Sequence, residues 1–167
     1  MRLSVFSLLS LAAMFQAPAP DRLITANGVG PIKVGMTLGE ARKAVPRAAF
    51  ARVSDGDGAA LVQIALARDV TMQAWADEED PAKPIDWRKK ILSIETFSAA
   101  FHTAEGAHPG MKVAAANRLY GATQAIETSE IESRQFITFA KHPAGLLFRL
   151  DETGGALLSI AISQLDR

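Results

Sequence analysis

The amino-acid sequence predicts an α+β fold of two tandem repeats, each with one helix packed on a three- to four-stranded antiparallel sheet. One motif occurs twice: Thr25-Ala-Asn-Gly28 precedes Gly35-Met-Thr-Leu38, and Thr103-Ala-Glu-Gly106 precedes Gly110-Met-Lys-Val113. A second shared motif, Ile91-Leu-Ser-Ile94 and Leu157-Leu-Ser-Ile160, closes each half. Internal repetition of this kind indicates repeated structural units. We therefore place the two repeats at residues 20–98 and 99–167 and expect them to share one core or a continuous sheet.

The first repeat contains one predicted helix, followed by strands. Thr37 is a favourable N-cap residue, Glu40 follows it at capping-box spacing, and Pro46 ends the helix. Leu38, Ala41 and Val45 form one apolar face at helical spacing. Runs rich in apolar or alternating residues predict strands at 49–54, 61–67, 70–76 and 90–97, with a turn at 55–58.

The second repeat shows the same order of elements. Residues 112–120 have helical character, and Gly121 ends that helix. Strands are predicted at 122–128, 135–140, 146–150 and 156–164, with a hairpin turn at 151–155. Tyr120 and Phe101 are expected in the core.

Residues 1–19 have the pattern of a signal peptide. A positive start is followed by an apolar stretch from Leu3 to Phe15 and by the small-x-small sequence Ala17-Pro18-Ala19. The alternative is a buried N-terminal helix or strand. We expect a periplasmic or secreted protein with no membrane span after signal removal, because no later apolar run reaches about 18 residues. The absence of cysteine predicts no lipid anchor.

Composition and motifs argue against several functional classes. Eighteen basic and eighteen acidic residues balance, which does not favour nucleic acid as a partner. Without cysteine there is no disulfide, thiolate nucleophile or Cys-type zinc site. The three histidines, His102, His108 and His142, follow no metal-ligand spacing, and no Gly-x-Ser-x-Gly motif occurs. We therefore expect no catalytic residue, no metal and no cofactor.

The two halves differ most between Trp75 and Trp87. The helix motifs lie 75 residues apart and the closing motifs 66 apart, so the first half carries about nine extra residues. This insertion is charged, contains two prolines and is flanked by the chain's two tryptophans. Because tryptophan is enriched at binding hot spots, Trp75 and Trp87 are the candidate partner-binding residues. The alternative is that both indoles pack the loop against the sheet. The acidic cluster at 77–80 is expected to be a solvated loop.

The run from Gly28 to Arg42 resembles the opening of two groups of secreted bacterial domains. These are SmpA/OmlA-type outer-membrane lipoprotein domains and tandem-repeat β-lactamase inhibitor proteins, in which a Gly-Met-Thr motif begins a helix that packs on an antiparallel sheet. The chain departs from both groups because it lacks their cysteines. The resemblance implies a tendency to bind proteins in the cell envelope and transfers no catalytic residue.

The expected function is therefore that of an exported, non-catalytic protein that binds another macromolecule, an envelope or secreted protein. A small-molecule carrier, an enzyme with a site between the two repeats, and a purely structural envelope component are the alternatives. A deep apolar pocket would favour the carrier, whereas a shallow sheet face would favour macromolecular binding.

Overall fold

The computed structural model describes residues 21–54, 58–129 and 134–163. The predicted signal peptide and most of the predicted turn at 55–58 lie outside these residues. Within them the chain forms two helices, α1 (Leu38–Ala44) and α2 (Val113–Tyr120). It also forms twelve strands: β1 (Leu23–Thr25), β2 (Gly28–Val29), β3 (Ile32–Lys33), β4 (Ala49–Ser54), β5 (Ala60–Ala67), β6 (Val70–Trp75), β7 (Ser93–Thr96), β8 (His102–Thr103), β9 (Thr123–Thr128), β10 (Gln135–Phe139), β11 (Leu147–Leu150) and β12 (Leu157–Ser163).

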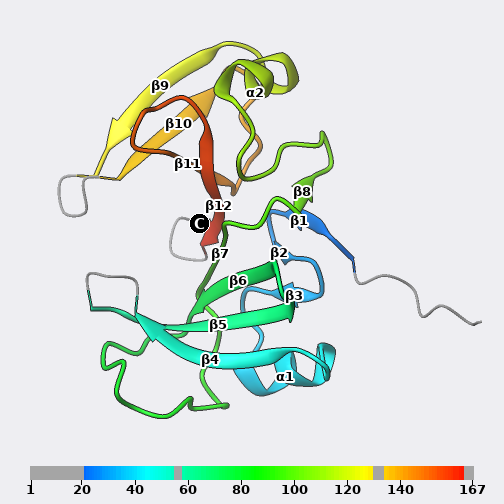
Figure 1. The fold of residues 1–167 in the computed structure, drawn as a ribbon, viewed down its shortest axis with the longest axis vertical. Helices are drawn as coiled ribbons and strands as arrows, with labels where there is room; N and C mark the ends of the chain where they lie inside the picture. The colour runs from blue at the N-terminus through cyan, green and yellow to red at the C-terminus, as the bar shows by residue number, and fades with distance from the viewer. Residues whose placement is uncertain (1–20, 55–57, 130–133, 164–167) are drawn as a thin grey trace, which may run out of the picture.

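Eight of these strands form one antiparallel sheet in the order β4-β5-β6-β7-β12-β11-β10-β9. Each half contributes a four-stranded meander. The two meanders join because their last strands, β7 and β12, pair with each other, with Ile94 opposite Ile162 and Thr96 opposite Ile160. Figure 1 shows the outer strands of the two halves diverging from this central pair.

A second, four-stranded sheet has the order β3-β2-β1-β8. Strands β1 and β8 pair in parallel, with Ile24 opposite Thr103. The His102 N–H also donates to the Arg22 carbonyl at 3.1 Å. This sheet connects the beginning of the first half to the beginning of the second (Figure 1).

The predicted α+β fold of two tandem repeats, each with one helix packed on a three- to four-stranded antiparallel sheet, is wrong. The described residues are mostly β, with helices of only seven and eight residues. The strands form one sheet of eight and one of four. The physical reason is that β7 and β12 use their free edges to pair with each other, which satisfies backbone groups that two separate sheets would leave exposed. The short strands before each helix pair their own backbone groups in the second sheet, where β1 pairs with β8.

The core lies on one face of the large sheet. Alternate residues along each strand point to it, among them Ile64, Met72, Ile94, Phe148 and Ile160, all at most 1% exposed. Both helices and the small sheet cover this face (Figure 1). They add further side chains to the same cluster: Leu38, Ala116 and Tyr120 from the helices, and Ile24, Val29 and Ile32 from the small sheet.

The Gly-Met motifs have the same local structure in both halves. Gly35 has φ +86° and donates its N–H to the Ile91 carbonyl at 2.7 Å; Gly110 has φ +83° and donates to the Leu157 carbonyl at 2.7 Å. These left-handed conformations favour glycine at both positions. The methionine after each glycine accepts a hydrogen bond back from the same residue: Met36 from the Ile91 N–H at 2.7 Å and Met111 from the Leu157 N–H at 2.8 Å. The predicted capping box before α1 is confirmed, because Thr37 and Glu40 bond reciprocally.

No helix in the ranges 21–54, 58–129 and 134–163 has the length and apolar character that a membrane crossing requires.

Candidate functional site

The face of the eight-stranded sheet opposite the core carries the residues that alternate with the buried ones. Pairing across β5, β6 and β7 aligns Gln63, Gln73 and Glu95 in one row. On the other side of the junction, Ser159 of β12 lies opposite Arg149 of β11. This face therefore presents a polar row across its centre, while its core side is apolar.

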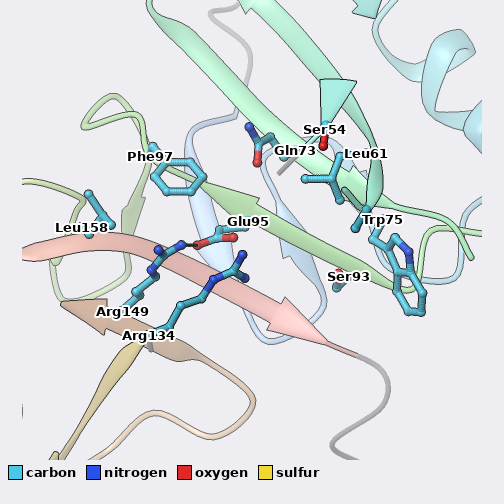
Figure 2. Close-up of a pocket in the computed structure, with 11 residues that line it drawn as sticks. Ser54, Leu61, Gln73, Trp75, Ser93, Glu95, Phe97, Arg134, Arg149 and Leu158 are labelled. Atoms are coloured by element: carbon cyan, nitrogen blue, oxygen red, sulfur yellow. Dashed lines mark ion pairs between the residues drawn. The ribbon is translucent and has the colours of Figure 1, made fainter. Parts of the chain in front are cut away.

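A pocket of about 520 Å³ lies on this face where the two halves meet. Strands β5, β6 and β7 form one side and β11 and β12 the other, and Figure 2 shows the lining side chains. The pocket is lined by Ser54, Ala59, Leu61, Gln73, Trp75, Ser93, Glu95, Phe97, Arg134, Arg149 and Leu158. We call it the junction pocket.

Glu95 lies at the centre of the junction pocket. The Ser159 hydroxyl donates a hydrogen bond to Glu95 Oε1, and Arg149 Nη1 lies 3.8 Å from the same oxygen. The Glu95 and Arg149 side chains are only 23% and 24% exposed. Because the pair is mostly shielded from solvent, its charges are less screened than those of a surface ion pair.

The Arg149 guanidinium has hydrogen-bonding capacity to spare. At 3.8 Å, its approach to Glu95 is an ion pair rather than a hydrogen bond. Arg149 hydrogen-bonds no residue in the described part of the chain through its side chain. Figure 2 shows Arg134 reaching toward Glu95 from the same side as Arg149. The lining residues that the structure describes thus bring two guanidinium groups to one carboxylate.

Apolar side chains lie at both ends of the junction pocket. Trp75 lies at one end, beside Ser93 across the β6–β7 pair. Phe97 and Leu158 lie at the other end and are 39% and 36% exposed. Figure 2 shows the charged groups between these two apolar ends.

Trp87, the second predicted partner-binding residue, lies elsewhere. Its ring meets Phe50 edge-to-face with centroids 5.6 Å apart, and the Arg42 guanidinium lies 4.8 Å from its centroid. Phe50 lies opposite Ile64, which is buried on the core face, whereas Trp75 lies opposite Leu61 on the open face. The two indoles therefore sit on opposite sides of the sheet and do not form one surface. Partner binding by either remains a prediction.

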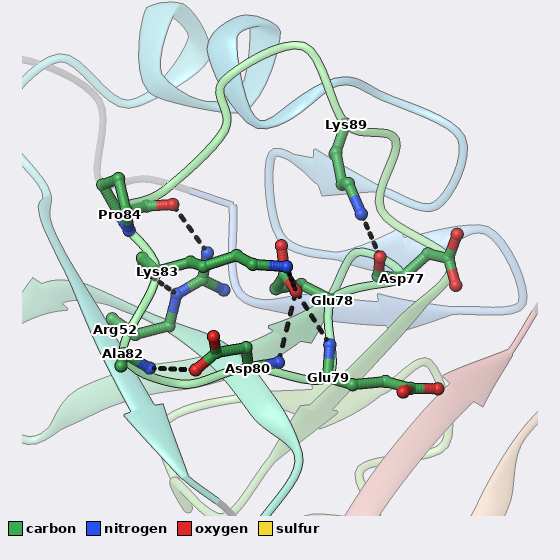
Figure 3. A network of polar contacts seen from close by, with 9 residues as sticks. All are labelled: Arg52, Asp77, Glu78, Glu79, Asp80, Ala82, Lys83, Pro84 and Lys89. Atoms are coloured by element: carbon green, nitrogen blue, oxygen red, sulfur yellow. Dashed lines mark hydrogen bonds and ion pairs between the residues drawn. The ribbon is translucent and has the colours of Figure 1, made fainter.

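The acidic side chains of the insertion stabilise its own turns. Glu78 Oε1 accepts the backbone N–H groups of Glu79 and Asp80 at 3.1 and 3.2 Å and pairs with Lys83 Nζ at 3.1 Å (Figure 3). The Asp80 N–H, followed by Lys83, holds the pKa of Glu78 below its usual value. No group of three or more potential metal ligands occurs in the residues described.

The insertion is also tied to the rest of the molecule. Arg52 of β4 donates to the carbonyls of Lys83 and Pro84, both at 3.2 Å (Figure 3). The Gly39 N–H of α1 donates to the Trp87 carbonyl at 2.8 Å. These contacts hold the insertion against α1 and the edge of β4, away from the junction pocket.

In the part of the chain that the structure describes, the three histidines and Ser159 form no catalytic set. Each histidine ring has a backbone carbonyl as its hydrogen-bond partner, 2.8 to 3.0 Å away. Ser159 touches a carboxylate, but it is 0% exposed, so its hydroxyl has no access to a substrate. Of the other serines, Ser133 lies outside the described residues.

Comparisons with known proteins add information on the fold alone. No family model matches the chain. No curated protein matches it either. Among solved structures, the chain is similar to the uncharacterized protein YfeY from Escherichia coli, with a TM-score of 0.54 and 11% identity over 85% of this chain and 99% of that one. At this identity, the likeness indicates a shared fold and nothing about activity.

Sequence reasoning missed the central residues of the junction pocket. Glu95 and Arg149 were assigned to strands without a role. The available signal was that both interrupt apolar strands with a charge, Glu95 directly after Ile94 and Arg149 directly after Phe148. Their meeting depends on the β7–β12 pairing, which no local pattern predicts.

Proposed function

We propose that this chain is an exported, non-catalytic protein that binds a segment of another macromolecule on the open face of its eight-stranded sheet. The observation that carries this proposal is the junction pocket, where a partly buried arginine presents hydrogen-bond donors that bond no described residue, between two apolar ends. Charged groups flanked by accessible aromatic side chains, here the partly exposed Trp75 and the exposed Phe97, are typical of recognition surfaces. The predicted signal peptide and the resemblance to envelope-associated domains support a partner in the cell envelope.

The polar centre of the pocket favours a macromolecule over a small molecule. Its volume of about 520 Å³ falls in the range of small-ligand sites, and this keeps a carrier function as the second candidate. However, such sites are usually deep and mainly apolar. The centre of this one is polar, and it continues into the partly exposed row of Gln63 and Gln73. An extended segment can use that continuous face, whereas a small molecule would use only its centre.

The two copies of the Gly-Met motif support an internal duplication of the sequence. Both copies directly precede a helix and bond to the motif that closes their half, at Ile91 and at Leu157. We propose that the duplication produced the two diverging meanders whose junction forms the pocket.

Site-specific photocrosslinking tests the proposed function. Benzoylphenylalanine replaces Phe97 at the rim of the junction pocket, and a matched control replaces Lys43, an exposed residue of α1 on the other side of the sheet. In cells that produce the protein, irradiation should yield a discrete adduct from position 97 and none from position 43. Excess unmodified protein should suppress that adduct. Absence of an adduct from position 97, or equal adducts from both positions, would overturn the proposal.

A further inference from the structure

Resting on the proposed function, we infer that the partner segment is an extended acidic peptide whose side-chain carboxylate binds Arg149 in the junction pocket. On either side of that acidic residue, at alternate positions, the segment carries apolar residues that contact Trp75 at one end and Phe97 with Leu158 at the other.

The first argument is the state of Arg149. The Arg149 side chain is 24% exposed, and its guanidinium makes no hydrogen bond within the described residues, so its donors are open to the pocket. Glu95 does not satisfy it, because the Glu95 oxygen nearest to Arg149 is 3.8 Å away and already accepts from Ser159. The planar fork of an arginine matches a carboxylate through two parallel hydrogen bonds. A carboxylate entering the pocket would therefore replace water as the acceptor of the Arg149 donors.

The second argument is the local charge. The described lining of the pocket carries the guanidinium groups of Arg134 and Arg149 and the carboxylate of Glu95. The open donors of Arg149 favour an anionic acceptor. Glu95 lies beside the place where the anion would bind, so a group with a single negative charge meets less repulsion than a doubly charged phosphate. The charges therefore select a carboxylate.

The third argument is the spacing of the pocket along β7. Ser93, which lies beside Trp75, is followed on the same face by Glu95 and then by Phe97. Side chains on one face of an extended chain repeat every second residue. A peptide lying along β7 would present its own side chains at the same repeat. It would thus place an acidic residue at the charged centre and apolar residues at the two ends.

Intrinsic fluorescence measures this binding directly. The chain has two tryptophans, so the variant W87F leaves Trp75 as the only indole. The probes are acetyl-Leu-Ser-Glu-Ser-Leu-amide and its isosteric twin with Gln in place of Glu. The Glu peptide should change the Trp75 emission saturably, and the Gln twin should bind at least about tenfold more weakly. Equal binding of the twins, or no change in emission with either peptide, would overturn the inference.

Variants of the arginine provide the second readout. In the W87F protein, R149Q should weaken binding of the Glu peptide at least about tenfold, because a buried charge pair is lost. R149K keeps the charge without the fork and should lie between R149Q and Arg149. The control R47Q changes an exposed arginine just beyond α1 and should leave affinity unchanged. Unchanged affinity in a folded R149Q or R149K variant contradicts the inference.

The two proposals fail separately. If the peptide twins bind equally while the crosslink from position 97 persists, the open face binds a macromolecule but does not read an acidic residue. If the crosslink from position 97 is absent, the proposed function itself is wrong.

Discussion

Tyr120 links three parts of the fold, and its removal has a calculable effect. Its hydroxyl lies 2.5 Å from Thr103 Oγ1 of β8 and donates to Glu105 Oε2 at 3.1 Å. Its ring packs against Phe139 and Phe148 of the large sheet. Y120F keeps the ring and removes the hydroxyl. It therefore isolates the polar contacts between the small sheet and the end of α2.

The expected cost of Y120F is about 1–2 kcal/mol of unfolding free energy. Thr103 is 1% exposed and its Oγ1 already accepts the Ala107 N–H at 3.1 Å. In Y120F the Thr103 hydroxyl loses the Tyr120 oxygen as its acceptor. A buried donor left unsatisfied costs about 1–3 kcal/mol. Glu105 is exposed and regains water, so its lost bond contributes little.

Tyr120 also makes the unfolding free energy depend on pH. Burial raises the pKa of Tyr120 from 10.0 to about 12, and the nearby Glu105 carboxylate acts in the same direction. The neutral phenol is thus favoured in the folded state. Its contribution to stability is complete below pH 10 and is lost as the pH rises toward 12, at up to about 1.4 kcal/mol per pH unit. The stabilities of the wild type and Y120F should converge over this range.

Two measurements check these values. Tyr120 is the only tyrosine, so the tyrosinate absorbance of the native protein reports its ionisation alone. Urea unfolding of the wild type and Y120F, at neutral pH and above pH 10, gives the difference in free energy. A native absorbance midpoint near 10.0, or a Y120F cost below about 0.3 kcal/mol at neutral pH, would refute the reasoning.

Other perturbations are predicted from single contacts, and urea unfolding measures each of them. T37A removes the N-cap of α1 and should cost about 1 kcal/mol, whereas an unchanged midpoint would mean that the capping box is not formed in solution. G28A would place a Cβ 2.1 Å from the Ile32 carbonyl oxygen and should cost about 3 kcal/mol. G106A has open space around the new Cβ and only the strain of φ +94°, so it should cost about 1–2 kcal/mol. A larger loss for G106A than for G28A would contradict the close approach of the chain at Gly28. W87A removes the packing on Phe50 and should cost about 2 kcal/mol, whereas W75A should cost about 1 kcal/mol or less, and equal losses would contradict the placement of the two indoles.

Local patterns predicted the elements better than their arrangement. The strand at 49–54 and the capping box at Thr37 follow from side-chain alternation and short-range hydrogen bonding, which a sequence displays directly. The β1–β8 pair does not, because β8 has only two residues, His102 and Thr103, and carries no periodicity. Its pairing is imposed by contacts some 80 residues apart along the chain. The same holds for β7 and β12, because a shared sheet was expected but the strands that join its two halves could not be identified from local patterns.

The candidate site illustrates the same limit. Trp75 was singled out for its residue type and does line the junction pocket, but Trp87, chosen on the same ground, packs on the other side of the sheet. Residue type alone cannot distinguish them, because the face on which a side chain lies depends on strand register. Glu95 and Arg149 meet only because the registers of β7, β12 and β11 bring them together.

The Glu95–Arg149 pair at the centre of the junction pocket is not well arranged to stabilise the fold by itself. A structural ion pair gains most when its hydrogen bonds are complete, because the cost of removing both charges from water must be offset. Here Arg149 is 24% exposed and stands 3.8 Å from Glu95, so the attraction is realised without the hydrogen bonds that would complete it. An apolar pair at these two positions would avoid that desolvation cost. The arrangement is better explained by a ligand that completes the bonds. This predicts that the double variant E95Q/R149M, which removes both charges and keeps an acceptor for the Ser159 hydroxyl, leaves the unfolding free energy within about 1 kcal/mol of the wild type or raises it. A loss of about 3 kcal/mol or more on urea unfolding would instead assign the Glu95–Arg149 pair to the stability of the sheet junction.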